Sequence, residues 1–259
     1  MTEPVWRVVI SEETDPAWNL AVDEAILRGI VSGDSPNTIR VWRSRESVIV
    51  GRCQDIRAEV DYLLCKEMGV PVLRRCSGGG AVYMDLGNYN YSVLTCDKAM
   101  NGMDTVHHVS RFICSAIVGL LSRLGCQSRF VYPSSVFVES QKISGSAQFM
   151  LYEGFLHHGT LLVSADLDMM QAVLNPDPAL AKSLRAVPST PSPVVNLSAL
   201  LKRELHPMEI THLLVESIMS LFERDSWTSG SINKSEHDMT QLLLEIKYSD
   251  SHWLQGTDV

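Results

Sequence analysis

The sequence predicts an α+β fold, in which hairpin-like strands are grouped between helices. Three strand-like segments, at 134–139, 142–151 and 155–164, follow one another directly. The glycine run at 78–80 precedes a short apolar segment typical of a strand, so it does not match the strand–turn–helix fingerprint of a dinucleotide site. No Gly-Lys-Ser/Thr follows the run, which excludes a P-loop. Grouped strands favour an α+β fold over a parallel doubly wound sheet.

The first half of the chain begins with a predicted helix at 16–31. Asp15 and Pro16 precede an apolar series there, which is a typical helix start. The next elements come in this order: strands at 38–42 and 47–51, a helix at 55–68 that ends before Gly69, and strands at 70–75 and 88–95 on either side of the glycine turn.

The second half contains a long amphipathic helix at 105–124, which Gly125 ends. After the three grouped strands, Asp166 begins a short helix. The segment 175–193 holds five of the eleven prolines and is predicted to be a loop across the surface. The final predicted elements are helices at 207–223 and 236–247.

Composition is that of an ordinary globular protein, and 259 residues can bury one large core or two small ones. The net charge of −8 argues against a nucleic-acid partner, which needs a basic surface. No apolar run has the length of a membrane span, and the N-terminus lacks a signal-peptide pattern. We therefore expect a cytoplasmic protein without membrane contact.

The six cysteines are dispersed and include no Cys-x-x-Cys pair. Metal-site spacing is absent, and a disulfide framework is not expected in a long cytosolic chain. Most of these thiols are predicted to be reduced packing residues.

The segment 74–83 carries the clearest chemical signal. Two arginines and a serine precede three glycines, and such a turn can aim backbone N–H groups and forked guanidinium donors at an anion. Alone, this pattern fits a hairpin with surface arginines equally well. Two further segments, 141–148 and 156–162, make a binding site the better interpretation.

Together these segments resemble the lipoate–protein ligase A family of the biotin/lipoate protein ligase superfamily. Matching blocks occur in family order: RRxSGGGAVY-x-DxGNxNYS at 74–92, KxSGSAQ at 142–148 and HHGTLL at 157–162. Weaker similarity occurs at 19–25, 48–54 and 247–256, so the resemblance spans nearly the whole chain.

The resemblance implies a single catalytic domain over 1–259. Its fold would be a mixed, largely antiparallel sheet flanked by helices, as in class II synthetases. Larger members carry a small further domain after a Trp-x-x-Gly tail, and only three residues follow Gly256 here. We therefore expect the C-terminal accessory domain to be absent.

The implied chemistry has two steps. Lipoate and ATP, which brings Mg²⁺, give lipoyl-adenylate, and a lysine of an acceptor protein then attacks it. The acceptor would be the lipoyl domain of a 2-oxoacid dehydrogenase E2, an H protein or a similar protein. Without an accessory domain, a separate small subunit is expected to be needed for adenylation.

Lys142 is the predicted catalytic residue. Its ammonium group can stabilise charge that develops on the acyl carbonyl and bridging oxygens, and losing one such donor typically costs about 3–4 kcal/mol of barrier. The alternative is a solvated lysine beside a strand. Its position directly before Ile-Ser-Gly-Ser-Ala matches the family motif and favours the catalytic role.

The resemblance assigns two further sets of residues, and Lys142 belongs to both. The adenylate set comprises Arg75, Ser77, Gly78, Gly79, Gly80, Ala81, Val82, Tyr83 and Asn88. The lipoyl set comprises Gly51, Arg52, Gly79, Gly145, Ala147, His158, Gly159 and Thr160.

No dedicated metal cluster is predicted, and Asp85 or Asn88 would contact Mg²⁺. Asp85 could equally belong only to a turn. Tyr83 could equally be a core residue. Of the neighbours His157 and His158, one should face the ligand and the other the core or solvent, because adjacent strand residues point to opposite sides.

Several positions are less certain matches. Arg74 should point away from the side that Arg75 faces. Met84 stands where the family commonly has His, which weakens the case for adenylation if that His contacts phosphate. Trp18, Val50 and Val72 are candidates for an apolar acyl channel.

Three competing functions are weighed against the ligase. An octanoyl or lipoyl transferase would use a cysteine thioester at Cys126, but such relatives replace the third glycine with arginine, and Gly80 is present here. A biotin ligase would carry a GRGRxGR-type loop, which is missing. A non-enzymatic binding module would not need Lys142 and Arg75 beside a glycine cradle.

Overall fold

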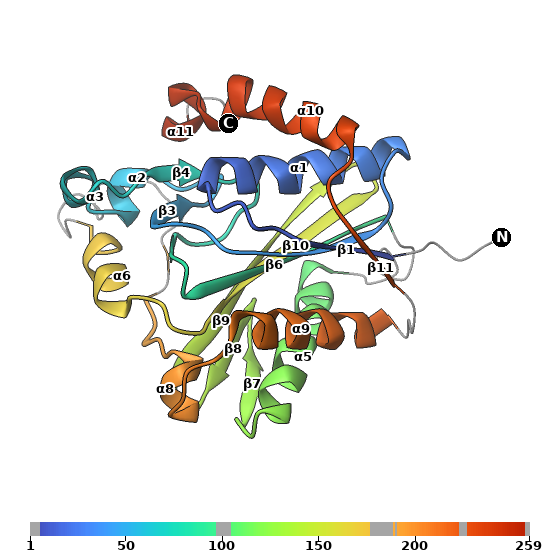
Figure 1. Ribbon diagram of the computed structural model, residues 1–259. Helices are drawn as coiled ribbons and strands as arrows, with labels where there is room; N and C mark the ends of the chain where they lie inside the picture. Colours follow the sequence, from blue (N-terminus) through green and yellow to red (C-terminus); the bar gives the residue numbers. More distant parts are fainter. Residues whose placement is uncertain (1–5, 97–104, 177–188, 190, 223–226, 257–259) are drawn as a thin grey trace.

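A mixed eight-stranded sheet and a smaller three-stranded sheet form the framework of the computed structural model (Figure 1). The structure describes residues 6–96, 105–176, 189, 191–222 and 227–256. The large sheet has the order β11-β1-β2-β6-β10-β9-β8-β7, and the small one β4-β3-β5. In the large sheet β1 pairs in parallel with β2 and β11, and the other neighbours are antiparallel. The expected mixed, largely antiparallel sheet is confirmed.

The strands are β1 (Trp6–Ile10), β2 (Thr38–Trp42), β3 (Ser47–Val50), β4 (Val72–Arg74), β5 (Val82–Met84), β6 (Asn88–Thr95), β7 (Ser128–Val131), β8 (Ser135–Val138), β9 (Gln141–Leu151), β10 (Gly154–Leu162) and β11 (Trp227–Gly230). The helices are α1 (Pro16–Ser32), α2 (Ile56–Glu59), α3 (Tyr62–Met68), α5 (Val106–Arg123), α6 (Leu167–Val173), α8 (Leu197–Leu201), α9 (Pro207–Met219), α10 (Lys234–Leu243) and α11 (Ser251–Gln255). A 3₁₀ turn (Ser220–Phe222) follows α9, and a π-helical turn (Leu244–Tyr248) follows α10.

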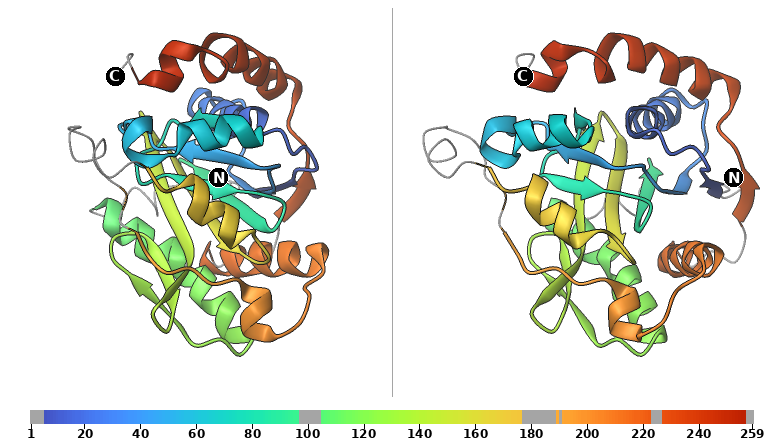
Figure 2. Two further views of the ribbon diagram at one scale, coloured as in Figure 1. Left: turned by 90° about the vertical axis from the view of Figure 1, so that its left-hand side faces the viewer. Right: turned by 60° about the vertical axis from the view of Figure 1, so that its left-hand side comes forward.

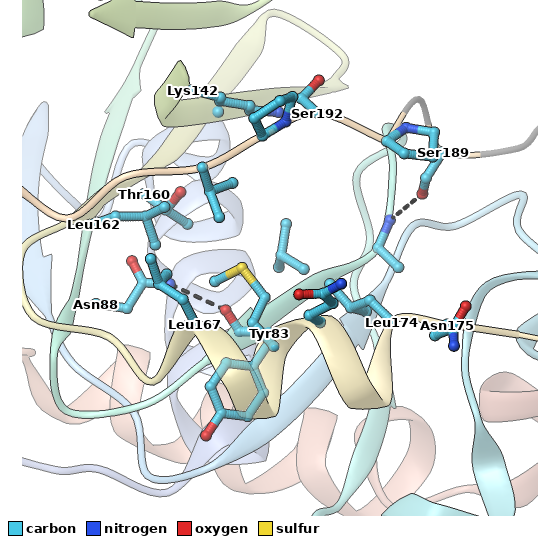
Figure 3. A pocket seen from close by; sticks show the side chains of 18 of the residues that line it. Tyr83, Asn88, Lys142, Thr160, Leu162, Leu167, Leu174, Asn175, Ser189 and Ser192 are labelled. Atoms are coloured by element: carbon cyan, nitrogen blue, oxygen red, sulfur yellow. Dashed lines mark hydrogen bonds between the residues drawn. The ribbon is translucent and has the colours of Figure 1, made fainter. Parts of the chain in front are cut away.

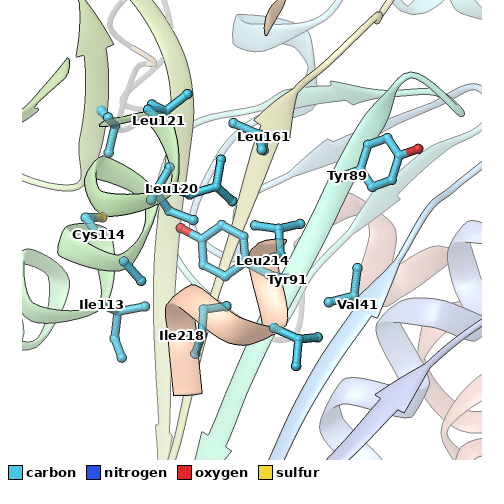
Figure 4. Close-up of a cluster of buried hydrophobic side chains, with 14 of the residues drawn as sticks. Val41, Tyr89, Tyr91, Ile113, Cys114, Leu120, Leu121, Leu161, Leu214 and Ile218 are labelled. Atoms are coloured by element: carbon cyan, nitrogen blue, oxygen red, sulfur yellow. The ribbon is translucent and has the colours of Figure 1, made fainter. Parts of the chain in front are cut away.

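Helices cover both faces of the large sheet. In the two side views, α1 and α10 lie on one side and α5 and α9 on the other (Figures 1 and 2). Alternation along β10 separates these faces: His158 and Thr160 point to the α1 side, and His157 and Leu161 to the α5 side. The α5 side holds the largest buried cluster, in which Tyr91 packs among aliphatic side chains of α5 and α9 (Figure 4). The α1 side holds smaller apolar clusters, one of which includes Leu156 of β10, and it also carries His158 and Thr160.

Local capping explains the helix boundaries. Asp15 accepts a hydrogen bond from the Trp18 backbone N–H at 2.9 Å, and Gly33 ends α1 in the left-handed region at φ 85°. Asp166 caps α6 in the same way, as the sequence predicts. The predicted and observed bounds of these helices agree to within a residue or so.

The expected single helix at 55–68 is wrong. Val60 is extended (φ −134°, ψ 137°), and the backbone N–H of Asp61 donates to the Val173 carbonyl at 2.9 Å. The Asp61 side chain then caps a second helix, α3. A contact with distant α6 therefore splits the segment.

Five short elements have no counterpart in the prediction: β1, β7, β11, α8 and α11. The predicted helix at 236–247 corresponds to α10, which begins at Lys234. It begins two residues earlier than expected because Asn233 and Glu236 form a reciprocal capping box. Most of the proline-rich segment 175–193 lies outside the described residues. No helix in the described part of the chain is long and apolar enough to cross a membrane.

Candidate active site

A cavity of about 980 Å³ lies where the ends of β5, β9 and β10 meet α6 and the segment 191–194 (Figure 3). Lys142, Ser192 and Thr160 border one side of it, and Leu167 and Leu174 of α6 the other. Seven predicted site residues line the cavity: Ala81, Val82, Tyr83, Asn88, Lys142, Gly145 and Thr160.

A β-bulge directs Lys142 toward this cavity. Phe137 of β8 pairs with Lys142 and Val136 pairs with Ser144, so Ile143 has no partner in β8. Without this extra residue, Lys142 and Gly145 would point to opposite faces of the sheet. In the structure the end of the lysine side chain lies over Gly145. The bulge thus brings the ammonium group to the ligand side of β9.

The Lys142 ammonium group has no hydrogen-bond or ion-pair partner among the described residues. Its backbone is fixed, because its N–H donates to the Pro193 carbonyl at 2.7 Å and its carbonyl accepts from the Val195 N–H at 3.1 Å. Burial and then the positive charge of Arg75 lower the pKa of Lys142. A fixed cation without an anion suits a site that receives negative charge.

Arg75 holds the glycine turn from behind. Its guanidinium donates to the carbonyls of Gly78 (Nη2, 2.6 Å), Gly80 (Nη2, 2.8 Å) and Ile49 (Nη1, 3.1 Å), and Nε donates to Ser77 Oγ at 3.0 Å. Burial lowers the pKa of Arg75 to about 10. No acidic side chain in the described part of the chain pairs with this buried charge. Arg75 therefore shapes the turn and leaves it electropositive.

Two glycines of the site permit close backbone approach. A Cβ at Gly51 would lie 2.1 Å from the Gly79 carbonyl oxygen. Gly79 has φ 85°, and a Cβ there would contact Arg75 and Ala147. The backbone N–H of Arg52 also donates to the Ser77 carbonyl at 2.8 Å. The 51–52 part of the predicted lipoyl set is thus packed against the turn rather than around the cavity.

Ser189 links the cavity wall to the glycine turn through hydrogen bonds. Its hydroxyl accepts from the Ala81 N–H at 2.9 Å and from Gln54 Nε2 at 3.1 Å, and it donates to Glu59. A Cβ at Gly80 would lie 2.7 Å from the Ser189 hydroxyl oxygen. The sequence interpretation missed Ser189 and Glu59, and the proline-rich segment next to Ser189 was the only signal available.

Arg74 points away from Arg75, as expected for neighbours at the end of a strand. It donates to the carbonyls of Gly51 (2.7 Å) and Gln54 (2.7 Å) and to that of Leu254 in the C-terminal helix (2.9 Å). The Trp253 indole N–H returns a hydrogen bond to the Arg74 carbonyl at 2.9 Å. The tail block thus stabilises the strand that enters the glycine turn.

The two neighbouring histidines have separate environments, as predicted. His157 is fully buried on the α5 side, where its Nδ1 contacts Gln148 Nε2 at 3.3 Å, and burial lowers its pKa to about 3. His158 faces α1, and its Nε2 lies 2.6 Å from Ser77 Oγ. Its Nδ1 lies 3.8 Å from a carboxylate oxygen of Asp23. His158 therefore links the sheet to the glycine turn.

Gly159 faces the core instead of a ligand. A Cβ there would lie 2.3 Å from the Tyr91 hydroxyl oxygen, so the glycine makes room for that side chain. Its expected place in the lipoyl set is not supported by this geometry. Ala147 pairs with His158 across β9 and β10 and lies on the α1 side.

Asn88 and Asp85 have different environments. Asn88 borders the cavity, its Nδ2 donates to the Tyr83 carbonyl at 3.1 Å, and its Oδ1 is buried without a partner among the described residues. Asp85 uses one oxygen for the Gly87 N–H and the other for the Asp166 N–H. An amide oxygen is a ligand that Mg²⁺ accepts, so Asn88 fits a metal contact and Asp85 fits the turn interpretation.

Several candidate positions are packing residues. The Tyr83 ring belongs to a buried cluster with Val50 and Val72, and Tyr83 borders the cavity through its backbone. Met84 packs with Trp42 and does not line the cavity, so the residue type at 84 leaves the cavity unchanged. Trp18 makes an edge-to-face contact with the surface residue His237. The expected acyl channel past Trp18, Val50 and Val72 is not supported.

Cys126 is a packing residue in this structure. It lies in the main core cluster on the α5 side, and burial raises its pKa. A cysteine nucleophile needs a lowered pKa and access to the acyl group. The position of Cys126 and its raised pKa therefore give no support to the thioester alternative.

The mixed sheet places Lys142 at the cavity, near a glycine turn that the buried Arg75 holds in shape. This arrangement is that of an acyl-activating catalytic domain. The model of the family "Lipoyl protein ligase A/B catalytic domain" matches residues 15–219, and the chain belongs to this family.

Three relatives support the assignment. Lipoate–protein ligase 1 of Staphylococcus aureus is 30% identical over 243 residues, which are 94% of this chain and 71% of that protein. A bi-partite lipoate protein ligase from Thermoplasma acidophilum, solved in a study that includes its E2 lipoyl domain, has a TM-score of 0.82 and 31% identity, covering 98% of this chain and 97% of that one. A lipoate-protein ligase A bound with ATP has a TM-score of 0.82 and 29% identity, covering 97% and 99%.

Proposed function

We propose that this chain is the catalytic chain of a lipoate–protein ligase, which forms lipoyl-adenylate from lipoate and ATP and transfers the lipoyl group to a lysine of an acceptor domain. The observation that carries the proposal is the Lys142 ammonium, which lies at the cavity without a partner among the described residues. Beside it is the glycine turn with Arg75, whose charge no acidic side chain of the described residues neutralises. Family membership and a relative bound with ATP support it.

In the first step, the carboxylate of lipoate attacks the α-phosphate of ATP and pyrophosphate leaves. The backbone N–H groups at 78–80 and the charge of Arg75 bind the phosphate oxygens. Lys142 stabilises the negative charge shared by the acyl and phosphate oxygens. Mg²⁺ would supply charge neutralisation when it binds with ATP, and Asn88, whose buried Oδ1 has no partner among the described residues, would hold it.

In the second step, the neutral amine of the acceptor lysine attacks the acyl carbonyl, and AMP leaves. Lys142 donates to the carbonyl oxygen as it becomes negative, and then to the departing phosphate. Losing this one donor removes about 3–4 kcal/mol of stabilisation.

The acceptor is a lipoyl domain, and a separate small subunit assists adenylation. The support is the bi-partite relative, of which this chain covers 97%, and its E2 lipoyl domain. The longer S. aureus ligase is covered only to 71%. In this proposal the described cavity holds the adenylate, and the partner helps to close it.

The experiment compares two reactions of the purified chain with one acceptor domain. One receives lipoate, ATP and Mg²⁺, and the other receives synthetic lipoyl-adenylate. We expect fast modification from the adenylate and slow or no modification from ATP. Equal fast rates would remove the need for a partner, and no modification in either reaction would contradict the ligase function.

A further inference from the structure

A chain of polar contacts connects Asp23 of α1 to the glycine turn. Asp23 Oδ2 lies 3.8 Å from His158 Nδ1, His158 Nε2 lies 2.6 Å from Ser77 Oγ, and Ser77 Oγ accepts from Arg75 Nε at 3.0 Å. All four residues are at least largely buried. Sequence similarity at 19–25 includes Asp23, but nothing in that similarity gives it a role.

The ends of this chain fix the direction of its protons. Arg75 Nε can only donate, so Ser77 Oγ must accept from it. The Ser77 hydroxyl proton is then available for His158 Nε2, which accepts it if His158 carries its proton on Nδ1. At 3.8 Å the contact with Asp23 is electrostatic rather than a direct hydrogen bond, and it favours a proton on Nδ1, since an unprotonated Nδ1 would direct its lone pair at a carboxylate.

Asp23 is itself held in one orientation. Its other oxygen accepts from Arg40 Nη1 at 2.8 Å, and Ser92 Oγ donates to Oδ2 at 2.7 Å. The Trp42 indole donates in turn to Ser92 Oγ at 3.3 Å. Both Asp23 and Arg40 are fully buried, so the carboxylate cannot turn away from His158 without leaving Arg40 unpaired.

We propose that Asp23 is a positioning residue that holds His158 in the Nδ1–H tautomer, and that His158 thereby fixes Ser77 and Arg75 under the glycine turn. Arg75 Nη2 then stays on the carbonyls of Gly78 and Gly80. The turn is shaped before the nucleotide arrives, so ATP binding does not have to order it. The inference rests on the proposed function for its kinetic readout.

The test is Asp23→Asn, which keeps the shape of the side chain and removes its charge. Long-range ¹H–¹⁵N spectra of histidine-labelled protein report the tautomer, with the His158 signals assigned from a His158→Gln variant. We expect the wild type to be Nδ1–H and the variant to shift toward Nε2–H. We expect the KM for ATP to rise about 10–100-fold, the range found when a metal-bound histidine loses the partner that orients it.

Asp238→Asn, at an exposed position of α10, is the matched control, because it makes the same change away from His158. It should leave both the tautomer and the KM for ATP unchanged. If Asp23→Asn does not fold, the double variant Asp23→Asn with Arg40→Met removes both buried charges and is measured in the same way.

An unchanged tautomer in the folded variant would overturn the proposal. A changed tautomer with an unchanged KM for ATP would also overturn it. A fall in kcat alone, in step with a loss of stability, would do the same. Direct calorimetric binding of ATP accompanies the kinetics. Wild-type protein that binds ATP but modifies no acceptor, even from synthetic lipoyl-adenylate, would refute the proposed function and leave this inference testable by binding.

Discussion

The side chain of Lys142 covers the backbone of Gly145 so closely that a Cβ at residue 145 would lie 2.8 Å from both Cε and Nζ of the lysine. The position of the ammonium group therefore depends on the absence of a side chain three residues further along β9. This relationship makes Gly145 a means of moving the ammonium without changing its chemistry.

Gly145→Ala should displace the Lys142 ammonium while the sheet stays intact, since the atoms that must move are the end of a flexible side chain. We expect transfer from preformed lipoyl-adenylate to fall about a hundredfold, the effect of misplacing a catalytic group by roughly 1 Å. Gly119→Ala in α5 is the control, because its Cβ would meet nothing within 4 Å. Wild-type transfer by Gly145→Ala would show that the ammonium tolerates displacement.

Lys142→Ala should keep the fold, because a partly exposed lysine at a cavity contributes little to the core. Single-turnover transfer from lipoyl-adenylate should fall at least about a hundredfold, as for loss of one oxyanion donor. Lys66→Ala, at an exposed position of α3, provides a variant with the same change outside the site. Undiminished transfer by Lys142→Ala would remove this residue from the mechanism.

The pH dependence of transfer should reflect the titration of Lys142. Burial and the charge of Arg75 lower its pKa from the ordinary 10.5, so the ammonium loses its proton at a lower pH than an exposed lysine. The ammonium is the active form, and we expect transfer to decline on the alkaline side below that ordinary value. Lys142→Arg keeps its charge at every accessible pH.

Rates measured from pH ~7 to ~10 with both proteins test this prediction. The acceptor amine gains reactivity as pH rises, and it does so equally with either protein. If Lys142→Arg shows the same alkaline decline, the decline is caused by another group.

Glu24→Gln should lower thermal stability at neutral pH, and this difference from the wild type should disappear in acid. Glu24 is buried, which alone raises its pKa, but the charge of Lys247 and hydrogen bonds from Lys247, Arg28 and Tyr248 outweigh burial and lower it below 4.5. A lowered pKa means that the ionised carboxylate stabilises the fold above its unfolded pKa, and that this contribution disappears as pH falls through the folded value.

Thermal unfolding of both proteins between pH ~7 and ~3 measures the effect. The difference in Tm should be constant near neutrality and shrink below about pH 4.5. A difference that grows in acid would reverse the assigned sign.

Local signals predicted most of the fold. Asp15, Asp166 and Gly33 fix helix ends within a few residues of themselves, and the grouped strands β8, β9 and β10 pair with near neighbours. The break at Val60 and Asp61 was not predictable, because it depends on a carbonyl in α6. Likewise β1 pairs in parallel with β11 more than 200 residues away, and no short-range pattern indicates such pairing.

The candidate site could be predicted only in part. Motif positions indicated Lys142, Arg75 and the glycine turn, and the structure brings them together. The bulge at Ile143, which decides where Lys142 points, follows from register with β8 and leaves no mark in the sequence. Gly159 shares a motif block with His158 but makes room for the Tyr91 side chain on the other side of the sheet, because adjacent strand residues belong to opposite faces.

The pairing of β11 with β1 also has a consequence for biosynthesis. The ribosome delivers Trp6–Ile10 more than 200 residues before Trp227–Gly230, so one edge of β1 has no partner while the residues between them are made. Its backbone donors and acceptors are open to other chains throughout that interval. When β11 arrives, Glu236 of the following helix forms an ion pair with Arg7 and closes this edge. A nascent chain stalled before residue 227 should therefore be the most aggregation-prone form of this protein.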